Sequence, residues 1–494
     1  MGEKSPGHAA SVVACPAGLA DVDLFGPGAQ EHWYQAYPLL HREAPVHVLR
    51  GEGINGSDAY VLTCFDDIER VVKDPQRFTP LLSVLLDELQ ATLDSGAQPA
   101  QDPSRFDIAL NSVRTLRPTL ALWRAHRQEL TDPWVGPGAK RHRAMITSVA
   151  DELIDRWIAG DSAVPPAHTT TGNRAAANTR NAAHPGADSG PASSLPSPAR
   201  KGSVEFIAAF ARPLPQRVMA NVLGFPPEDV PQLARWGAAQ VMQYVVGSGP
   251  LNVLSAEQAA VQAQQLEGFA EYLQDQVASK RANPADDMIS ALTRVKYQAL
   301  GRKLTDDEVY GIIYFMVLGG LETTQYALEA QAQLLCDDPA LFAALRRTPG
   351  KIRAFTEEAL RLRAPTQGLS TRLTTRDELF QGVPVPAGSI LHLRFAAGNV
   401  DPRQYECPYT LDLNRKAVSK HLSFSQGPRT CPGAGISRLE QVIAWQRLCE
   451  RFATLSYAPG NTLTHQPGVM LGTLQLQLEY TTAQCAGHGG GGNG

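Results

Sequence analysis

Residues 421–440, HLSFSQGPRTCPGAGISRLE, hold a single cysteine, Cys431, in a loop rich in glycine and proline. From Gly435 onward the apolar residues recur at helical spacing, which predicts a helix that begins just after the cysteine. Free backbone N–H groups and the helix dipole stabilise a thiolate at such a position. Gly427 and Gly433 have no Cβ atom, so a flat group could lie against this backbone. The stretch therefore favours a cysteine thiolate that binds a metal.

Two more side chains of this loop suit a bound cofactor. Phe424 could shield the sulfur from water, and Arg429 could offer two parallel hydrogen bonds to a carboxylate. For any one residue, a buried structural cysteine before a core helix is the simpler interpretation. The positions together resemble the haem-binding signature of the cytochrome P450 family, Phe-x-x-Gly-x-Arg-x-Cys-x-Gly. The resemblance implies that Cys431 is the axial iron ligand and that Arg429 pairs with a haem propionate. It also implies cofactor contacts for Phe424 and Gly433, whereas Ser425 replaces the glycine that the family usually has.

A second motif lies inside a long predicted helix. Thr305 and Glu308 have the spacing of a capping box, and the helical pattern continues to Cys336, before Asp337. Within it, residues 319–324 read GGLETT. Two adjacent glycines in a helix interior cost about 1 kcal/mol each relative to alanine. Either close packing against another helix or a flat cofactor lying on the helix would explain them.

The GGLETT run resembles the oxygen-binding groove of the same family, and is very similar to that of its camphor-hydroxylase branch. The resemblance implies that Gly319 and Gly320 lie against the haem. It also implies that Glu322 relays protons and that Thr323 supplies a hydroxyl beside the oxygen. Taken without the resemblance, a tight helix crossing with a threonine bonded to its own backbone is the simpler interpretation.

Further residues are assigned to the haem rim by the same resemblance. Trp123 and Arg127 are four residues apart and so share one helix face. A surface arginine beside a packed tryptophan is the commoner meaning of that pattern, but the resemblance implies that both reach the haem propionates. It implies a second propionate contact for Arg372, at the head of a predicted strand.

Glu358 and Arg361 face each other on a predicted helix. They resemble the buried Glu-x-x-Arg pair of the family, which normally gains a basic third partner. At the matching place this chain has Thr410. Either Thr410 bonds the pair, or Arg403 or Arg415 substitutes.

The chain divides into a loose arm (1–30), one haem-thiolate domain (31–480) and a flexible glycine-rich tail (481–494). Residues 163–202 are dominated by small and polar residues, and we expect a disordered insertion there, because such a segment cannot bury enough apolar surface to offset its ordering entropy. The expected fold class is mainly α with small β-sheets. The resemblance implies the cytochrome P450 fold, a triangular helical prism with haem between the oxygen-site helix and the cysteine-loop helix.

Composition limits the class of protein. The chain has 494 residues, of which 43% are hydrophobic and 19% charged, as in ordinary globular proteins. A net charge of −4 gives no sign of nucleic-acid binding. The seven cysteines form no CxxC motif, which fits a reducing cytoplasm. No apolar run approaches the roughly 20 residues that span a bilayer, so no membrane anchor is expected. We expect a cytoplasmic monomer.

The function implied by the resemblance is monooxygenation with haem b and O2, by hydroxylation or O-dealkylation of a small-to-medium hydrophobic substrate. Electrons would come from a ferredoxin and its NAD(P)H-dependent reductase, docking near Arg429 and Arg438. Leu318, Leu369 and Leu471 are candidate pocket residues. A peroxygenase or isomerase on the same haem, a haem-thiolate sensor and a non-haem interaction protein remain alternatives.

Overall fold

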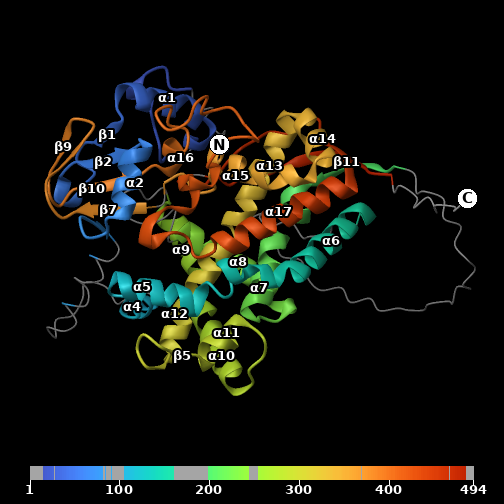
Figure 1. Ribbon diagram of the computed structural model, residues 1–494, viewed down its shortest axis with the longest axis horizontal. Coiled ribbons are helices and arrows are strands. Elements are labelled where there is room, and N and C mark those ends of the chain that lie inside the picture. Colours follow the sequence, from blue (N-terminus) through green and yellow to red (C-terminus); the bar gives the residue numbers. More distant parts are fainter. Residues whose placement is uncertain are drawn as a thin grey trace, which may run out of the picture.

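The computed structural model describes residues 15–26, 28–81, 84, 91, 105–160, 199–243, 254–368, 370–466 and 468–484. Helices make up most of the molecule and the sheets are small, as predicted; the largest sheet lies at one side, whereas β11 and β5 lie elsewhere (Figure 1). The helices are α1 (Trp33–Glu43), α2 (Phe65–Lys73), α4 (Arg105–Thr115), α5 (Leu120–His126), α6 (Arg143–Ala159), α7 (Pro213–Leu223), α8 (Val230–Val241), α9 (Ala256–Gln265), α10 (Phe269–Ala282), α11 (Met288–Arg294), α12 (Asp306–Gly320), α13 (Thr323–Asp337), α14 (Pro339–Arg347), α15 (Ile352–Leu362), α16 (Phe395–Gly398) and α17 (Ala434–Arg451).

The largest sheet combines strands from residues 46–80 with strands from residues 370–393. Its strand order is β1-β2-β10-β7-β3, with β2 antiparallel to β1 and parallel to β10. Successive β2 side chains enter different cores, because strand side chains alternate between the two faces. Val61 packs in the cluster that contains α1, whereas Tyr60 and Leu62 pack with α2. The strands are β1 (Val46–Leu49), β2 (Ala59–Leu62), β3 (Phe78–Pro80), β7 (Ser370–Thr374) and β10 (Ile390–Leu393).

Smaller sheets complete the β structure, and one of them bounds the predicted insertion. In the sheet β11-β12-β4, β4 pairs antiparallel with β12. Residues 163–198 lie outside the described residues, but Lys201 and Gly202 already belong to β4, so the insertion prediction runs at least two residues too far. The remaining strands are β4 (Lys201–Glu205), β5 (Lys296–Tyr297), β6 (Arg302–Lys303), β8 (Glu378–Phe380), β9 (Val383–Val385), β11 (Phe452–Tyr457) and β12 (Gln477–Thr482).

The ends of the domain also differ from the sequence prediction. In the predicted loose arm, residues 15–26 and 28–30 are described, and Leu24 is buried beside Trp33 in one apolar cluster. In the predicted tail, Thr481 and Thr482 belong to β12, while residues 485–494 lie outside the described residues. Nowhere in the described part of the chain is a helix long and apolar enough to cross a membrane.

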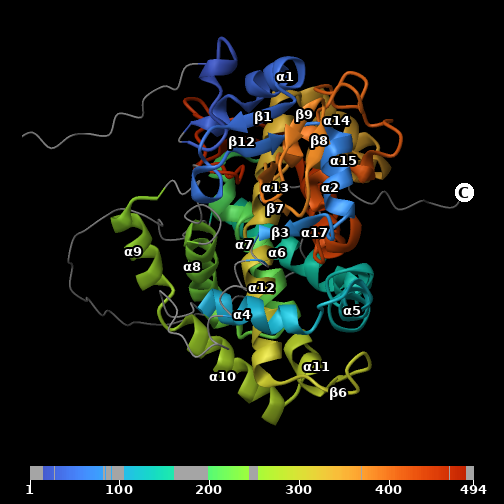
Figure 2. The same cartoon turned by 90° about the vertical axis from the view of Figure 1, so that its left-hand side faces the viewer.

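A central pair of helices organises the molecule. Figure 2 shows α12 and α13 following one another through its middle, with α10 and α11 near one end and the large sheet near the other. α12 packs against α4, α7, α8, α10 and α11, so it is apolar on most sides. The predicted single long helix is interrupted at Leu321 and Glu322. The Thr323 hydroxyl donates to the Gly319 carbonyl at 2.9 Å, an oxygen that would otherwise accept the Thr323 N–H.

The ion pair of α15 is fully buried and has a basic third partner. Arg361 Nε lies 2.8 Å from Glu358 Oε1, and neither side chain is exposed. Arg415 Nε donates to the same Glu358 oxygen at 3.0 Å. Thr410 contributes its backbone carbonyl, which accepts from both arginines. Arg415 is therefore the substitute that the sequence left open, and Arg403 instead reaches the His41 carbonyl.

Candidate functional site

The cysteine loop is a compact turn that ends at the N-terminus of α17. The Cys431 N–H donates to the Phe424 carbonyl at 2.8 Å and closes the loop. Gly427 has a φ of +71°, and an added Cβ would lie 2.7 Å from the Val72 carbonyl oxygen. This position therefore needs glycine for both its conformation and its close contact. Ser425 has φ 56° and ψ −174°, a region that only glycine populates readily. The serine thus keeps the bend that a glycine would adopt without strain.

The surroundings of the Cys431 thiol have opposing effects on its pKa. Burial raises its pKa above the usual value, and this effect outweighs the others. The backbone N–H groups of Gly433 and Ala434 and the guanidinium groups of Arg127 and Arg438 lower it. Without a metal the sulfur is a neutral thiol near neutral pH. A bound metal cation would deprotonate it, and the surrounding donors would then stabilise the thiolate.

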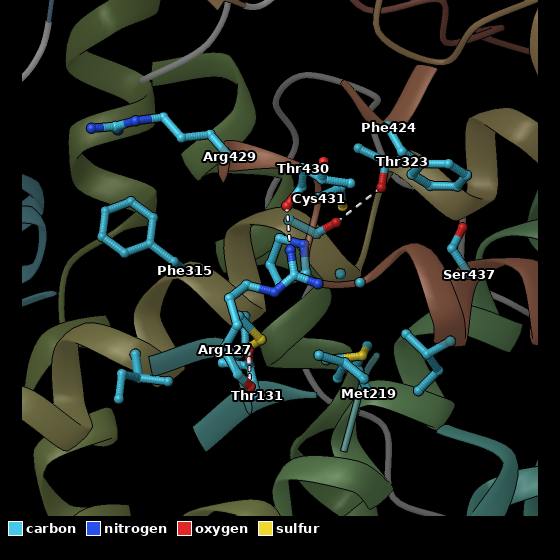
Figure 3. A pocket seen from close by; sticks show the side chains of 18 of the residues that line it. Arg127, Thr131, Met219, Phe315, Thr323, Phe424, Arg429, Thr430, Cys431 and Ser437 are labelled. Atoms are coloured by element: carbon cyan, nitrogen blue, oxygen red, sulfur yellow. Dashed lines mark hydrogen bonds between the residues drawn. The ribbon is translucent and has the colours of Figure 1, made fainter. Parts of the chain in front are cut away.

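Cys431 opens onto a cavity between the loop, the α12–α13 junction, α7 and α5 (Figure 3). Phe424, Thr430 and Cys431 of the loop line it together with Phe315 and Thr323 of the junction, and Met219 comes from α7. The cavity is lined by Val113, Arg117, Trp123, His126, Arg127, Thr131, Val135, Met219, Ile312, Phe315, Met316, Gly319, Gly320, Thr323, Thr324, Phe424, Arg429, Thr430, Cys431, Pro432, Gly433, Ile436, Ser437 and Glu440.

Most of the site residues predicted from the sequence meet at this cavity, and two do not. Glu322 and Arg372 are absent from the lining. Those that meet there are Trp123, Arg127, Gly319, Gly320, Thr323, Phe424, Arg429, Cys431 and Gly433.

The two adjacent glycines, Gly319 and Gly320, have different surroundings. An added Cβ at Gly319 would meet no atom within 4 Å, so this backbone faces open space in the cavity. At Gly320 the same atom would lie 2.9 Å from Met219 Cγ, so this backbone packs tightly against α7. Close packing against another helix, one of the two explanations offered by the sequence, therefore applies to Gly320, and the backbone at Gly319 leaves room for the flat cofactor of the other explanation.

Glu322 and Thr323 point to different surroundings. The Thr323 hydroxyl lines the cavity and donates to the Gly319 carbonyl, as the simpler sequence interpretation expected (Figure 3). Glu322 is buried and accepts a hydrogen bond from the Tyr326 hydroxyl. Burial raises the pKa of Glu322, although the bond from Tyr326 lowers it. Its carboxyl group therefore holds a proton more readily than an exposed glutamate.

Arginines gather at one side of the cavity. Arg127 is compensated, because it lies 3.0 Å from Asp132 and donates to the Thr430 carbonyl at 2.6 Å (Figure 3). Among the described residues, no carboxylate pairs with Arg117 or Arg429 at the cavity, or with Arg372, which lies near Arg429 but outside the lining. Burial and the charge of Arg429 lower the pKa of Arg372 to about 10. A negatively charged group is the natural complement of this cluster.

The sequence did not identify several lining residues. Arg117, in the turn before α5, carried no motif, and nothing in the sequence marked it. His126 is three residues after Trp123, so helical spacing could have placed both on one face. Glu440 is buried, its Oε2 has no hydrogen-bond partner among the described residues, and burial raises its pKa far above the usual value.

Other predicted roles find different structural explanations. Arg438 is held by Glu357, with Nε 2.7 Å from Oε1, rather than free on the surface. Leu318 packs beside a separate apolar cluster and Leu471 is part of another, and neither lines the cavity. Leu369 lies outside the described residues.

The residues present fit a haem. A cysteine sulfur lies at one wall, an open glycine backbone at another, and unpaired guanidinium groups at the rim. These match an iron ligand, a flat ring and two carboxylates, respectively. Apolar side chains line much of the remainder, including Val113, Val135, Ile312, Phe315, Met316 and Ile436.

Comparison with known proteins identifies the family. The model of the family Cytochrome P450 matches residues 352–480. The 6-deoxyerythronolide B hydroxylase of Saccharopolyspora erythraea is 30% identical over 441 residues, which cover 88% of this chain and 92% of the relative. The cyclomarin C epoxidase CymV of Salinispora arenicola is 33% identical over 257 residues, which cover 52% of this chain and 63% of the relative.

A solved structure shares the fold. P450BioI in complex with hexadec-9Z-enoic acid ligated acyl carrier protein has a TM-score of 0.70 and 20% identity, over 91% of this chain and 99% of that chain. Its likeness agrees with the helical architecture around the cysteine pocket. Because the hydroxylase is similar across nearly the whole chain, this protein belongs to the cytochrome P450 family and is a haem-dependent monooxygenase that uses O2.

Proposed function

We propose that this protein hydroxylates or O-dealkylates a small-to-medium hydrophobic substrate at a haem b held by Cys431, with electrons from a ferredoxin and its NAD(P)H-dependent reductase. The observation that carries the proposal is the meeting of Cys431, Gly319 and Thr323 at one cavity, although they come from distant parts of the chain. When bound, haem supplies the iron chemistry that activates O2 and transfers one oxygen atom to a substrate.

In this proposal, residues of the cysteine loop and of neighbouring elements bind the haem. Cys431 binds the iron through its thiolate, and N–H groups of Gly433 and Ala434 stabilise the sulfur's negative charge. Arg429 and Arg372 hold propionates, since both guanidinium groups lack a carboxylate partner among the described residues. Gly319 leaves the space that a flat ring requires.

Thr323 and Glu322 hold protons for the reaction. The Thr323 hydroxyl is fixed by its bond to the Gly319 carbonyl, so its oxygen keeps a defined position at the cavity wall. Glu322 holds a proton more readily than an exposed glutamate, because burial raises its pKa. Its bond to Tyr326 directs it away from the cavity, so proton delivery through Glu322 requires this side chain to leave Tyr326.

A hydrophobic substrate suits the cavity because most of its lining outside the arginine cluster is apolar. One relative is named a 6-deoxyerythronolide B hydroxylase and another a cyclomarin C epoxidase. We therefore place the compounds in these two names, 6-deoxyerythronolide B and cyclomarin C, beside other hydrophobic molecules in a substrate screen. The screen would measure the shift of the haem absorption band when each compound binds.

Electron transfer is expected on the surface beside α17. Arg438 is bound to Glu357, and Arg429 faces the cavity, so neither offers the free positive charge that the sequence suggested. Lys140 and Arg143 are exposed in the segment that packs on the N-terminus of α17. We propose these two residues as contacts for an acidic ferredoxin.

The decisive experiment is the reduced-CO spectrum of haem-loaded protein. Wild type should show the absorption band of a thiolate-ligated haem, and Cys431→Ala should lose it, because no other cysteine among the described residues lines the cavity. Cys407→Ser is the matched control, since Cys407 is exposed and lies outside the cavity lining. A thiolate band that survives in Cys431→Ala would exclude the proposed ligand.

Peroxide-driven oxygenation on the same haem is the second candidate. The orientation of Glu322 toward Tyr326 favours it, because a reaction fed by peroxide does not need delivered protons in the same way. Product that forms with reductase, ferredoxin and NAD(P)H would support the monooxygenase if its formation is unaffected by catalase, which destroys peroxide. Removal of O2 should then abolish product formation. Product formed only with added peroxide would support the second candidate.

A further inference from the structure

Two polar side chains at the cavity, Arg117 and His126, have no role in the function described so far. His126 is 1% exposed, lines the cavity, and neither ring nitrogen has a hydrogen-bond partner among the described residues. A neutral imidazole carries one N–H donor and one acceptor nitrogen. A buried donor left without an acceptor is unfavourable, so this ring is expected to bond to a group that enters the cavity.

Arg117 is tied to the same place through an aromatic ring. Its guanidinium carbon lies 3.8 Å from the centroid of the Trp123 ring, and that of Arg429 lies 5.0 Å from the same centroid. Cation–π contacts of this kind favour a defined position for each guanidinium. The Trp123 ring thus contacts both Arg429, which belongs to the haem-binding signature, and Arg117, which does not.

The charges around these residues repel each other unless an anion intervenes. Burial, with the positive charges of Arg429 and Arg127, lowers the pKa of Arg117 to about 9. Burial, with the charges of Arg117 and Arg127, lowers the pKa of His126 to about 3, so the ring is neutral. The cluster therefore consists of cations and a neutral donor, and a carboxylate would relieve the repulsion and accept the donor's hydrogen bond.

We propose that Arg117 and His126 form an additional carboxylate-binding site, organised by Trp123, that holds a haem propionate. The inference rests on the proposed function, because it takes haem as the occupant of the cavity. It adds two positioning residues to the arginines expected from the family signature. Arg117 supplies charge and His126 supplies a neutral hydrogen bond.

The test is the rate at which haem-loaded protein loses haem to excess apomyoglobin. Arg117→Leu and His126→Leu should each lose haem about tenfold faster or more, as expected for removing a hydrogen bond to a charged group. His126→Gln keeps a neutral donor and should stay close to wild type. Arg124→Leu is the control, because Arg124 is an exposed arginine on the same helix and does not line the cavity.

A more conservative variant and a second property, the reduction potential of the iron, keep the proposal testable if Arg117→Leu or His126→Leu folds poorly. In Arg117→Lys, the charge remains but the planar contact with Trp123 is weakened, so haem loss should lie between wild type and Arg117→Leu. The reduction potential of the iron should fall in Arg117→Leu, because a nearby positive charge favours the reduced state. Arg124→Leu should leave that potential unchanged.

The outcomes separate the two proposals. If wild type shows no thiolate-ligated haem, the proposed function fails. If the thiolate band is normal but Arg117→Leu and His126→Leu lose haem at the Arg124→Leu rate, only the propionate site is overturned. Unchanged haem loss together with lost binding of carboxylate-containing substrates would also overturn it, and would assign the two residues to the substrate.

Discussion

Ser425 has a strained backbone conformation at the bend of the cysteine loop. Its backbone lies in a region that costs a non-glycine residue on the order of 1–3 kcal/mol. Its hydroxyl is buried and has no hydrogen-bond partner among the described residues, so the side chain returns little of this cost. The loop closure between Cys431 and Phe424 nevertheless retains the bend.

Replacing Ser425 with glycine should therefore stabilise the protein. We expect Ser425→Gly to raise the free energy of unfolding by about 1 kcal/mol, because glycine adopts this conformation without a Cβ clash. Gly427→Ala should do the opposite, since its Cβ would meet the Val72 carbonyl oxygen at 2.7 Å. Denaturant midpoints of the two haem-loaded variants check the signs. A destabilised Ser425→Gly would mean that the serine side chain has a stabilising contact.

Thr323 is the hydroxyl best placed to act in the reaction. Thr323→Ala should consume NAD(P)H while product per NAD(P)H falls on the order of tenfold or more, with hydrogen peroxide released instead. Thr323→Ser keeps the hydroxyl and should retain most of the coupling. Simultaneous assays of NAD(P)H, peroxide and product measure this. Tight coupling in Thr323→Ala would remove Thr323 from the proton path.

At the scale of elements, the α15 ion pair joins this helix to the segment that leads into the cysteine loop. Glu358 accepts hydrogen bonds from Arg361, Arg415 and the Asp412 N–H. A buried carboxylate needs this many partners, because water no longer solvates it. The three donors keep residues 410–415 fixed against α15, shortly before the loop that carries Cys431.

Loss of the third partner should loosen this junction. We expect Arg415→Leu to lower the free energy of unfolding by about 1–3 kcal/mol, the cost of removing hydrogen bonds to a buried charge. Arg353→Leu, an exposed change on the same helix, should stay within about 0.5 kcal/mol of wild type. Urea unfolding with unchanged slope measures both. Equal stability of the two variants would show that Arg361 alone compensates Glu358.

At the scale of the whole molecule, the cavity exists only because distant elements meet. The α12–α13 junction supplies one wall and the cysteine loop another, while Arg117 and Arg127, which flank α5, form the cationic rim together with Arg429. Close backbone contacts fix this arrangement. An added Cβ at Gly435 would lie 2.1 Å from the Gly136 carbonyl oxygen, and the Ile436 N–H donates to Val135. The segment after Gly136 is thereby held beside α17, where the exposed basic residues lie.

Charge reversal on this surface tests electron transfer. Lys140→Glu with Arg143→Glu should raise the KM for reduced ferredoxin about tenfold at low salt and leave kcat at saturation almost unchanged, since exposed charges mainly steer association. Lys303→Glu is the control, because Lys303 is exposed on β6, away from α17 (Figure 2). Added salt should shrink the difference. An unchanged KM at low salt would place the docking surface elsewhere.

The sequence by itself determined the parts of the site that depend on local spacing. Cys431, Arg429 and Gly433 share one loop, and Gly319 and Thr323 share one helical run, so their order along the chain was enough to bring each set together. The sequence could also indicate the helical class, because apolar periodicity is local.

Only the tertiary structure decided which residues complete these sets. The partner of Glu358 is Arg415, 57 positions away, and Arg127 bonds to Thr430 across 303 positions. The tertiary structure also brought Arg117 and His126 to the same cavity as Cys431. Such contacts depend on how helices and loops pack in space, and no spacing along the chain encodes that packing directly.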